Sequence, residues 1–189
     1  GFHAGDPMWI RHTVELAEDH NVAIGAHPSF PDLLGFGRRN MNLSENEVIN
    51  YIMYQTGALM TFTNDKKLQH IKPHGAMYNM AVNDEIIARA ICQAVMEINR
   101  ELILVVLAGS PWEQVAVEMG VRIAREAFAD RAVNLDGSLV PRALPGSMIE
   151  DPDDVAQRSL QIVTTGTITT ISGEDIPVQA DTLCLHGDT

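Results

Sequence analysis

Four histidines of this chain stand in short turns beside glycine or proline, and these turns are where the sequence could do chemistry. His27, His74 and His186 each come at or just after the end of a short apolar run that predicts a buried strand. His3 lies in a similar turn, and would also follow a strand if preceding residues supplied one. In parallel α/β folds the carboxyl ends of the strands meet at one face, where active sites lie. We therefore expect the four histidines to converge.

Histidines that converge can bind a metal or transfer protons. Neutral imidazole binds divalent metals well, so His3, His27, His74 and His186 are the candidate ligands. Nearby carboxylates that could complete an open coordination sphere are those of Asp6, Asp32 and Asp188. The sequence has no compact His-x-x-His or His-Glu-x-x-His spacing, and each histidine could instead only satisfy a loop. General acid–base work remains the other interpretation.

Four basic residues stand near these turns. Lys72 ends the same predicted strand that precedes His74, where it could polarise a carbonyl, bind a carboxylate or act as a base. A salt bridge to a neighbouring acid is the structural alternative. Arg38, Arg39 and Arg142 could grip an anionic substrate, or could brace their loops.

Several common catalytic motifs are not found in the sequence. It contains neither a P-loop nor a Gly-x-Gly-x-x-Gly pattern, and no Gly-x-Ser-x-Gly elbow. Gly109 and Ser110, just before a predicted helix, could hold an anion at the helix N-terminus. Cys92 and Cys184 lie in apolar surroundings and are interpreted as small core residues.

Short strands alternate with helices along the chain. The expected strands are residues 22–26, 68–72, 102–107, 121–124 and 181–185, with a small hairpin of 168–171 and 176–179. The expected helices are residues 7–20, 45–64, 84–99, 111–119 and 151–165. This alternation predicts one domain, residues 1–189, with a parallel sheet covered by helices. An open doubly wound sheet and a closed barrel both fit the pattern.

The composition narrows the class of partner. The 189 residues are 46% hydrophobic and carry a formal net charge of -12, which disfavours nucleic acid and anionic membranes. No apolar run approaches a membrane span and no leader begins the chain, so we expect a cytoplasmic protein. The chain begins without methionine and ends in a polar turn, so we expect a fragment of a longer protein. A homo-oligomer is compatible with the sequence.

Several longer motifs resemble the LamB/YcsF family. Gly-Phe-His-Ala-Gly-Asp-Pro at residues 1–7 is similar to its opening segment, and residues 24–32 with 35–39 are similar to its long signature loop. Residues 72–79 (Lys-Pro-His-Gly-Ala-Met-Tyr-Asn), 128–131 and 181–189 complete the resemblance, which covers essentially the whole chain.

The resemblance implies a distorted, TIM-like β/α barrel similar to the glycoside hydrolase/deacetylase fold. It also implies the A subunit of an enzyme that converts 5-oxoproline to L-glutamate with ATP hydrolysis, assembled with B and C subunits. ATP would then be handled by the complex. Relative to the family pattern, this chain lacks an N-terminal acidic strand motif and a C-terminal helix, so part of the site is expected to be absent.

The chemistry that follows is hydrolytic opening of a five-membered lactam, whose carbonyl must be polarised or phosphorylated before water attacks. We assign carbonyl polarisation and proton transfer to His27, Lys72 and His74. The residues that would orient water or a metal are Asp32, His186 and Asp188. The substrate-binding candidates are His3, Asp6, Arg38, Arg39, Tyr78, Asn79 and Arg142, with Arg39 on the substrate carboxylate.

Two rival functions remain open at this point. One is a metal-dependent deacetylase or amidohydrolase that works without ATP. The other is a module that binds a lactam or carbohydrate and regulates partner subunits without catalysing a reaction. Bound metal with ATP-free activity would favour the first, whereas loss of activity on histidine substitution would exclude the second.

Overall fold

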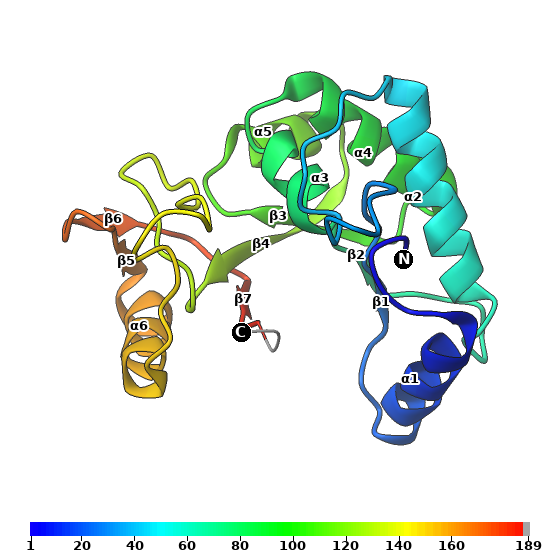
Figure 1. The fold of residues 1–189 in the computed structure, drawn as a ribbon, viewed down its shortest axis with the longest axis horizontal. Helices are drawn as coiled ribbons and strands as arrows, with labels where there is room; N and C mark the ends of the chain where they lie inside the picture. Colours follow the sequence, from blue (N-terminus) through cyan, green and yellow to red (C-terminus); the bar gives the residue numbers. More distant parts are fainter. Residues whose placement is uncertain (187–189) are drawn as a thin grey trace.

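A single parallel sheet forms the centre of the computed structural model, which describes residues 1–186. Its strands are β1 (Gly25–Ala26), β2 (His70–Ile71), β3 (Ile103–Leu107), β4 (Arg122–Phe128) and β7 (Thr182–Cys184). They pair in the order β1-β2-β3-β4-β7, and every pairing is parallel. A doubly wound sheet reverses its order at a switch point, whereas a barrel wall does not. The unreversed order and the curvature in Figure 1 therefore match the wall of a β/α barrel.

The strands that lead to the histidines are shorter than expected, but backbone pairing continues past them. The Lys72 N–H donates to the carbonyl of Ala26 at 2.9 Å, and the His74 N–H donates to that of Pro28 at 2.8 Å. This continuation fixes the register of the two histidine turns relative to each other. Val22, which was expected to begin the first strand, is instead 59% exposed.

Strand β4 runs four residues beyond the expected end at residue 124. Arg125 and Glu126 break the apolar run, and this hid the rest of the strand from a pattern search. Both charges are paired in the structure. The Arg125 guanidinium contacts Glu113 at 2.6 Å, and Glu126 contacts Lys72 at 2.6 Å.

Residues 1–186 form six helices, and most of them begin at a recognisable cap. They are α1 (Pro7–Asp19), α2 (Glu45–Met60), α3 (Gly75–Ala81), α4 (Glu85–Ile98), α5 (Pro111–Glu118) and α6 (Pro152–Thr165). Ser44 and Glu47 form the expected capping box, and Asp84 caps α4. Helix α3 was not expected, because its seven residues directly follow the His74 turn and are too few to show a helical period.

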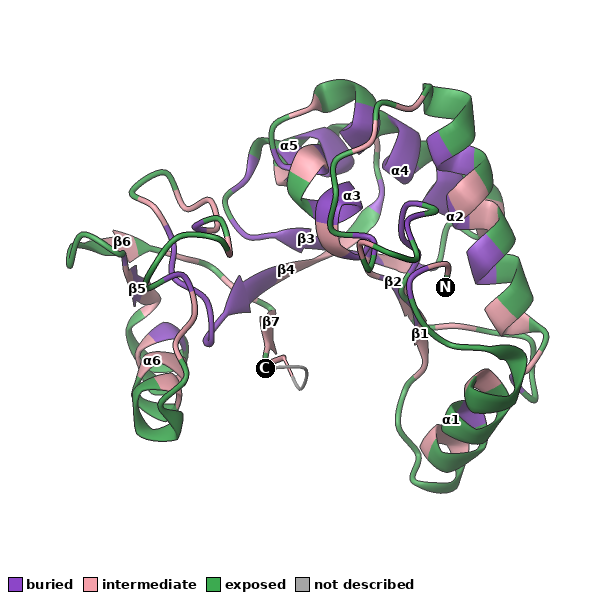
Figure 2. Ribbon diagram, in the orientation of Figure 1, coloured by how far each residue is buried: buried purple, intermediate pink, exposed green. Residues whose placement is uncertain are grey.

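The main core lies between the sheet and helices α2, α4 and α5 (Figure 2). Ile52, Ile91, Leu104 and Trp112 are each 0% exposed. Burying an aliphatic side chain of this size contributes about 1.5–3 kcal/mol to stability. This packing makes β2 and β3 a rigid support for the turns that follow them.

A smaller unit is attached to β4. It contains α6 and the expected hairpin, whose strands are β5 (Thr167–Thr169) and β6 (Asp175–Pro177), paired antiparallel. Its own small core includes Ile162 and Ile168 and joins the sheet at Ala127. Helices α1 and α6 lie at opposite ends of the molecule (Figure 1). None of the helices formed by residues 1–186 has the length and hydrophobicity needed to cross a membrane.

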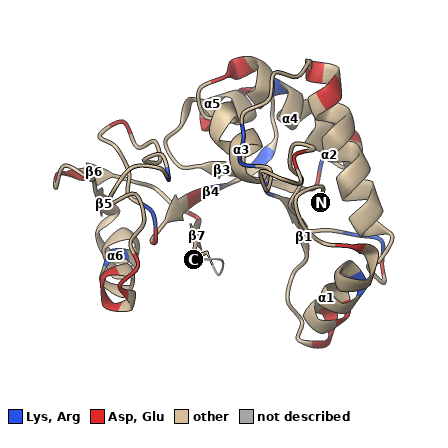
Figure 3. Ribbon diagram, in the orientation of Figure 1, with Lys and Arg blue, Asp and Glu red and all other residues tan. Residues whose placement is uncertain are grey.

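Acidic residues account for the net charge and lie mainly on the surface. Figure 3 shows Asp and Glu on several outer helices, including α1 and α6. Asp151, Asp153 and Asp154 belong to the cap and first turn of α6, where negative charge opposes the positive end of the helix dipole.

Candidate active site

The carboxyl ends of the strands hold two groups of ionisable side chains. The first is the histidine cluster, defined as His3, His27 and His74. The second is the strand-end polar group, defined as Lys72, Glu126, Asp130, Cys184 and His186. His27, His74, Lys72, Asp130 and His186 lie just beyond the ends of β1, β2, β4 and β7, where the sequence predicted a site, and Cys184 ends β7. Glu126 lies within β4, near its end, and His3 comes from the segment before α1.

The histidine cluster is tightly packed. The rings of His3 and His74 stack with centroids 3.8 Å apart and an interplanar angle of 3°. His74 Nδ1 lies 2.9 Å from His27 Nε2, and the two rings meet edge to face. One nitrogen from each of the three histidines lies within 4.8 Å of the other two. Such a group has the donor set of a metal site.

A loop with positive backbone φ angles covers the cluster. Phe36 has φ of 54° and Gly37 has φ of 67°, and the Phe36 ring packs perpendicular to the rings of His3 and His74. A Cβ at Gly37 would lie only 2.9 Å from the Cβ of Ser29 and 3.1 Å from the His74 ring. Glycine is therefore required at this position by both its conformation and the lack of space.

Asp32 and Arg39 hold this loop in its conformation. The Asp32 carboxylate accepts from the Gly35 N–H at 2.9 Å and from the Arg39 guanidinium, while its carbonyl accepts from the Gly37 N–H at 2.8 Å. The hydrogen bond from Arg39 holds the pKa of Asp32 at about 2. Asp32 was expected to orient water or a metal, and Arg39 was expected to hold the substrate carboxylate. In the structure the two residues brace the loop, which was the alternative interpretation of the arginine.

Gln55 positions the segment that carries His3. Its side-chain oxygen accepts from the N–H groups of Phe2 and Ser29, and its amide donates to the Ser29 carbonyl at 2.9 Å. Gln55 lies on α2 and is only 7% exposed, yet nothing in the sequence distinguishes it from a surface glutamine. A buried amide that ties two distant turns together is a long-range feature that sequence patterns do not reveal.

Lys72 lies at the centre of the strand-end polar group. Its ammonium contacts Glu126 Oε1 at 2.6 Å and Cys184 Sγ at 3.0 Å, and it lies 5.1 Å from the centre of the Phe128 ring. The Glu126 side chain is 4% exposed and that of Lys72 is 21% exposed. The salt bridge to an acid, which was the alternative interpretation of Lys72, is thus present at the site itself.

Asp130 orients His186. One carboxylate oxygen of Asp130 accepts from the His186 backbone N–H at 2.8 Å and contacts His186 Nδ1 at 2.7 Å. A carboxylate at Nδ1 fixes the imidazole tautomer and leaves Nε2 to exchange protons. His186 therefore pairs with Asp130, while the histidine cluster forms from the other three expected histidines.

Burial controls the protonation of both groups. Burial, with a smaller contribution from nearby His74, lowers the pKa of His3 to about 3. Although His27 as a residue is exposed, the protein atoms around its ring desolvate it and lower its pKa to about 3. Burial alone would lower the pKa of Lys72, but Glu126 and Cys184 outweigh it and raise the pKa above its usual value. Burial also raises the pKa of Glu126, against the opposing effect of Lys72.

Three of the expected substrate-binding residues lie in different surroundings. Asp6 caps α1, accepting from the Met8 N–H at 2.8 Å, and Asn79 is exposed on α3. Tyr78 is buried, with its ring 5.2 Å from that of Trp112, and burial together with nearby Glu126 raises its pKa.

Both remaining expected arginines lie beside ring or cationic groups. The Arg38 guanidinium lies 5.1 Å from the centre of the Phe36 ring, next to the histidine cluster. Arg142 lies close enough to Arg131 to lower its pKa, although burial of Arg131 is the larger cause. Asp188 lies outside the described residues.

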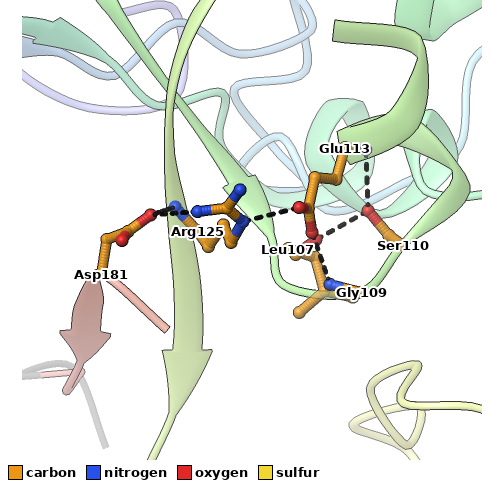
Figure 4. Close-up of polar contacts among 6 residues, drawn as sticks. All are labelled: Leu107, Gly109, Ser110, Glu113, Arg125 and Asp181. Carbon is orange, nitrogen blue, oxygen red and sulfur yellow. Dashed lines mark hydrogen bonds and ion pairs between the residues drawn. The ribbon is translucent and has the colours of Figure 1, made fainter. Parts of the chain in front are cut away.

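The turn after β3 does not offer the anion site that its sequence suggested. Figure 4 shows that Glu113 occupies it, with Oε2 accepting from the Gly109 N–H at 2.7 Å and Ser110 capping α5. The other Glu113 oxygen contacts Arg125, which also reaches Asp181 at 3.3 Å. The protein's own carboxylate thus fills the helix N-terminus.

Comparisons with known proteins give one consistent result. The family model described as LamB/YcsF family matches residues 1–189. The 5-oxoprolinase A subunit of Pyrococcus furiosus is 52% identical over 190 residues, covering all of this chain and 74% of that protein. The 5-oxoprolinase A subunit of Syntrophobacter fumaroxidans is 53% identical, covering all of this chain and 75% of that protein.

A solved structure agrees with the architecture described above. The lactam utilization protein from Thermus thermophilus superposes with a TM-score of 0.92 at 48% sequence identity. The match covers 98% of this chain and 76% of that protein.

Proposed function

The chain belongs to the LamB/YcsF family, and from this premise we propose that it is the A subunit of a 5-oxoprolinase, a hydrolase of a cyclic amide. The reaction adds water to the lactam carbonyl of 5-oxoproline and breaks the ring C–N bond. The ring nitrogen becomes the amino group of L-glutamate, and the carbonyl carbon becomes its side-chain carboxylate. The observation that carries the proposal is the strand-end polar group, in which the Lys72 ammonium and the Asp130-oriented imidazole of His186 stand at the carboxyl ends of β2 and β7 of one parallel sheet.

Lys72 supplies the positive charge that this chemistry needs. Charge develops on the carbonyl oxygen, or on a phosphoryl group attached to it, as water attacks. Glu126 holds the ammonium in place at 2.6 Å, so the cation is positioned before substrate arrives. In a site where Lys72 is mostly withdrawn from solvent, its charge acts with less screening than it would in water.

His186 is the group that we propose moves protons. With Nδ1 held by Asp130, its Nε2 takes a proton from the attacking water and returns one to the leaving ring nitrogen. Asp130 was not among the residues expected from the sequence. The histidine cluster is linked to the strand-end polar group through Lys72, whose carbonyl accepts from His27 Nδ1 at 2.5 Å and whose ammonium contacts Glu126.

We also propose that ATP is hydrolysed in the assembled complex with the 5-oxoprolinase B and C subunits. The word "subunit" in the names of the relatives supports an assembly, and an activated carbonyl supports coupling to ATP. A cytoplasmic location is compatible with both cysteines, Cys92 and Cys184, being free thiols.

The test is glutamate release from 5-oxoproline by the full-length protein, with and without ATP and the two partner subunits. We expect glutamate only when ATP and the partners are present. His186→Gln is expected to lower kcat at least about 100-fold with little change in melting temperature, as for loss of a general acid–base. His20→Gln, on the exposed end of α1, is the matched control and is expected to retain full activity.

One alternative has support in the geometry. The histidine cluster has the donor set of a metal-dependent amidohydrolase or deacetylase. Glutamate formed without ATP, and lost on chelation, would favour that function over the ATP-dependent one. Binding of 5-oxoproline without turnover under any condition would contradict both.

A further inference from the structure

Two backbone carbonyls determine where the protons of His27 and His74 lie. A carbonyl oxygen only accepts hydrogen bonds, so the 2.5 Å contact from His27 Nδ1 to the Lys72 carbonyl requires a proton on Nδ1. The 2.8 Å contact from His74 Nε2 to the Phe36 carbonyl requires a proton on Nε2 in the same way. In neutral rings the lone pairs are then on His27 Nε2 and His74 Nδ1.

Those two nitrogens face each other at 2.9 Å. The chain of contacts from Lys72 through His27 and His74 to Phe36 has three links and needs three N–H groups. Two neutral imidazoles supply two. Whichever tautomers are chosen, one link brings two acceptors together, and a positive species between the rings removes this conflict.

We propose that this species is a divalent transition-metal ion of the zinc class, bound by His27 Nε2 and His74 Nδ1 with His3 as the third ligand. The proposal does not depend on the oxoprolinase function, because it is argued from the contact between His27 and His74, the convergence of three histidines and the buried Nδ1 of His3. Metal-binding histidines usually donate their outer N–H to a backbone carbonyl or carboxylate, and both rings already do so here.

His3 provides an independent observation that points to a ligand. Its Nδ1 is buried and has no hydrogen-bond partner among residues 1–186, and the residue is only 8% exposed. A buried polar atom without a partner costs about 1–3 kcal/mol, which binding an ion would recover. Because the His3 and His74 rings are parallel, the His3 ring must turn for its lone pair to reach an ion held by the other two.

The donor set favours zinc-like ions over magnesium or calcium. Imidazole nitrogen suits Zn²⁺, Co²⁺ and Ni²⁺, whereas Mg²⁺ and Ca²⁺ prefer oxygen ligands. Three histidines leave a fourth position of a tetrahedral ion open, as in catalytic zinc sites.

The competing occupant is a proton shared by His27 and His74, which would complete the same hydrogen bonds without a metal. Chelator-treated full-length protein is titrated with Zn²⁺, and with Co²⁺ as a spectroscopic substitute, by calorimetry and visible absorption. ¹⁵N NMR of the imidazoles is recorded with and without Zn²⁺. His27→Ala and His74→Ala test the two ligands fixed by hydrogen bonds, and His3→Ala tests the third. His12→Ala, at an exposed position of α1, and His20→Ala, at the exposed C-cap of this helix, are the matched controls.

We expect one equivalent of Zn²⁺ to bind, Co²⁺ to show the absorption of a tetrahedral site, and Mg²⁺ not to compete. Affinity should fall at least about 100-fold in His27→Ala and His74→Ala, by less in His3→Ala, and remain unchanged in the controls. If a ligand variant does not fold, the wild-type NMR decides, because Zn²⁺ must shift His27 Nε2 and His74 Nδ1. A His27–His74 pair that keeps its shared proton in stoichiometric Zn²⁺, or affinity unchanged by the His27 and His74 substitutions, overturns the proposal.

Discussion

Removing one partner of the Lys72–Glu126 pair should be far more damaging than removing both. The Nζ–Oε1 distance is 2.6 Å and the Glu126 side chain is 4% exposed. At an effective dielectric of about 20, two unit charges at this separation attract by about 6 kcal/mol. Desolvation offsets most of that attraction, so replacing both partners with apolar residues changes stability little, whereas a single replacement leaves one charge buried alone.

The perturbation is a double-mutant cycle of Lys72→Met, Glu126→Leu and the double variant. Each single substitution is expected to lower the free energy of unfolding by about 3–5 kcal/mol, and the double variant by less than either. Urea unfolding followed by tryptophan fluorescence measures these values, because Trp112 is 0% exposed and reports on the core.

The loss in Lys72→Met should depend on pH. Without the ammonium, burial raises the pKa of Glu126 further above its unfolded value. A carboxyl whose pKa is raised on folding stabilises the protein below its unfolded pKa, and this contribution is lost as pH rises through the folded pKa. Lys72→Met should therefore regain stability relative to wild type as pH falls from about 7 toward about 4.

Two results would refute the reasoning. Single substitutions that each cost less than about 1 kcal/mol would show that the pair behaves as an exposed salt bridge. Costs that simply add in the double variant would show that Lys72 and Glu126 act independently. Either result would also remove the argument that Glu126 positions the Lys72 ammonium for catalysis.

Three further predictions concern the loop, the oriented histidine and a helix cap. Gly37→Ala should lower stability by at least about 1–2 kcal/mol in urea unfolding, because its φ is 67° and a Cβ meets Ser29; a neutral effect would mean that the loop relaxes freely. Asp130→Asn should lower kcat for glutamate formation on the order of 1000-fold with KM nearly unchanged, since His186 loses its tautomer control. Burial alone would raise the pKa of Asp130, but the hydrogen bonds from His186 outweigh burial and lower it. The stability of the wild-type protein should therefore fall as pH drops below about 4. The Asp130→Asn variant should lack this fall. Ser44→Ala should cost about 1 kcal/mol by thermal unfolding and leave activity unchanged, because it removes only a cap.

The parts of the fold that the sequence predicts are those governed by local patterns. The capping box at Ser44, the apolar run that forms β3 and the Gly-containing hairpin between β5 and β6 each occur where expected. Strand order was left open between a sheet and a barrel, because it depends on long-range pairing. Helix α3 escaped notice because a helix of only seven residues, beginning at Gly75, is too short to show a period.

In the candidate site, too, the residues marked by local patterns were predicted, and those that depend on distant partners were missed. Histidines beside glycine and proline at strand ends are conspicuous, and the structure brings His3, His27 and His74 together. Glu126 was missed because it lies inside a charged stretch, where only a partner from another strand makes a buried carboxylate tolerable. Gln55 was missed because its partners lie in two other segments of the chain.

The histidine cluster and the strand-end polar group meet at Lys72, and they contact different parts of this residue. The Lys72 carbonyl holds His27, while the Lys72 ammonium holds Glu126. Because a backbone carbonyl is present whatever the side chain, the tautomer of His27 depends on the register of β2 and not on lysine. The position of the positive charge, by contrast, depends on the Lys72 side chain and on its ion pair with Glu126. Evolution of this face can therefore alter the cation without disturbing the histidine cluster, whereas a register shift in β2 would disrupt both groups together.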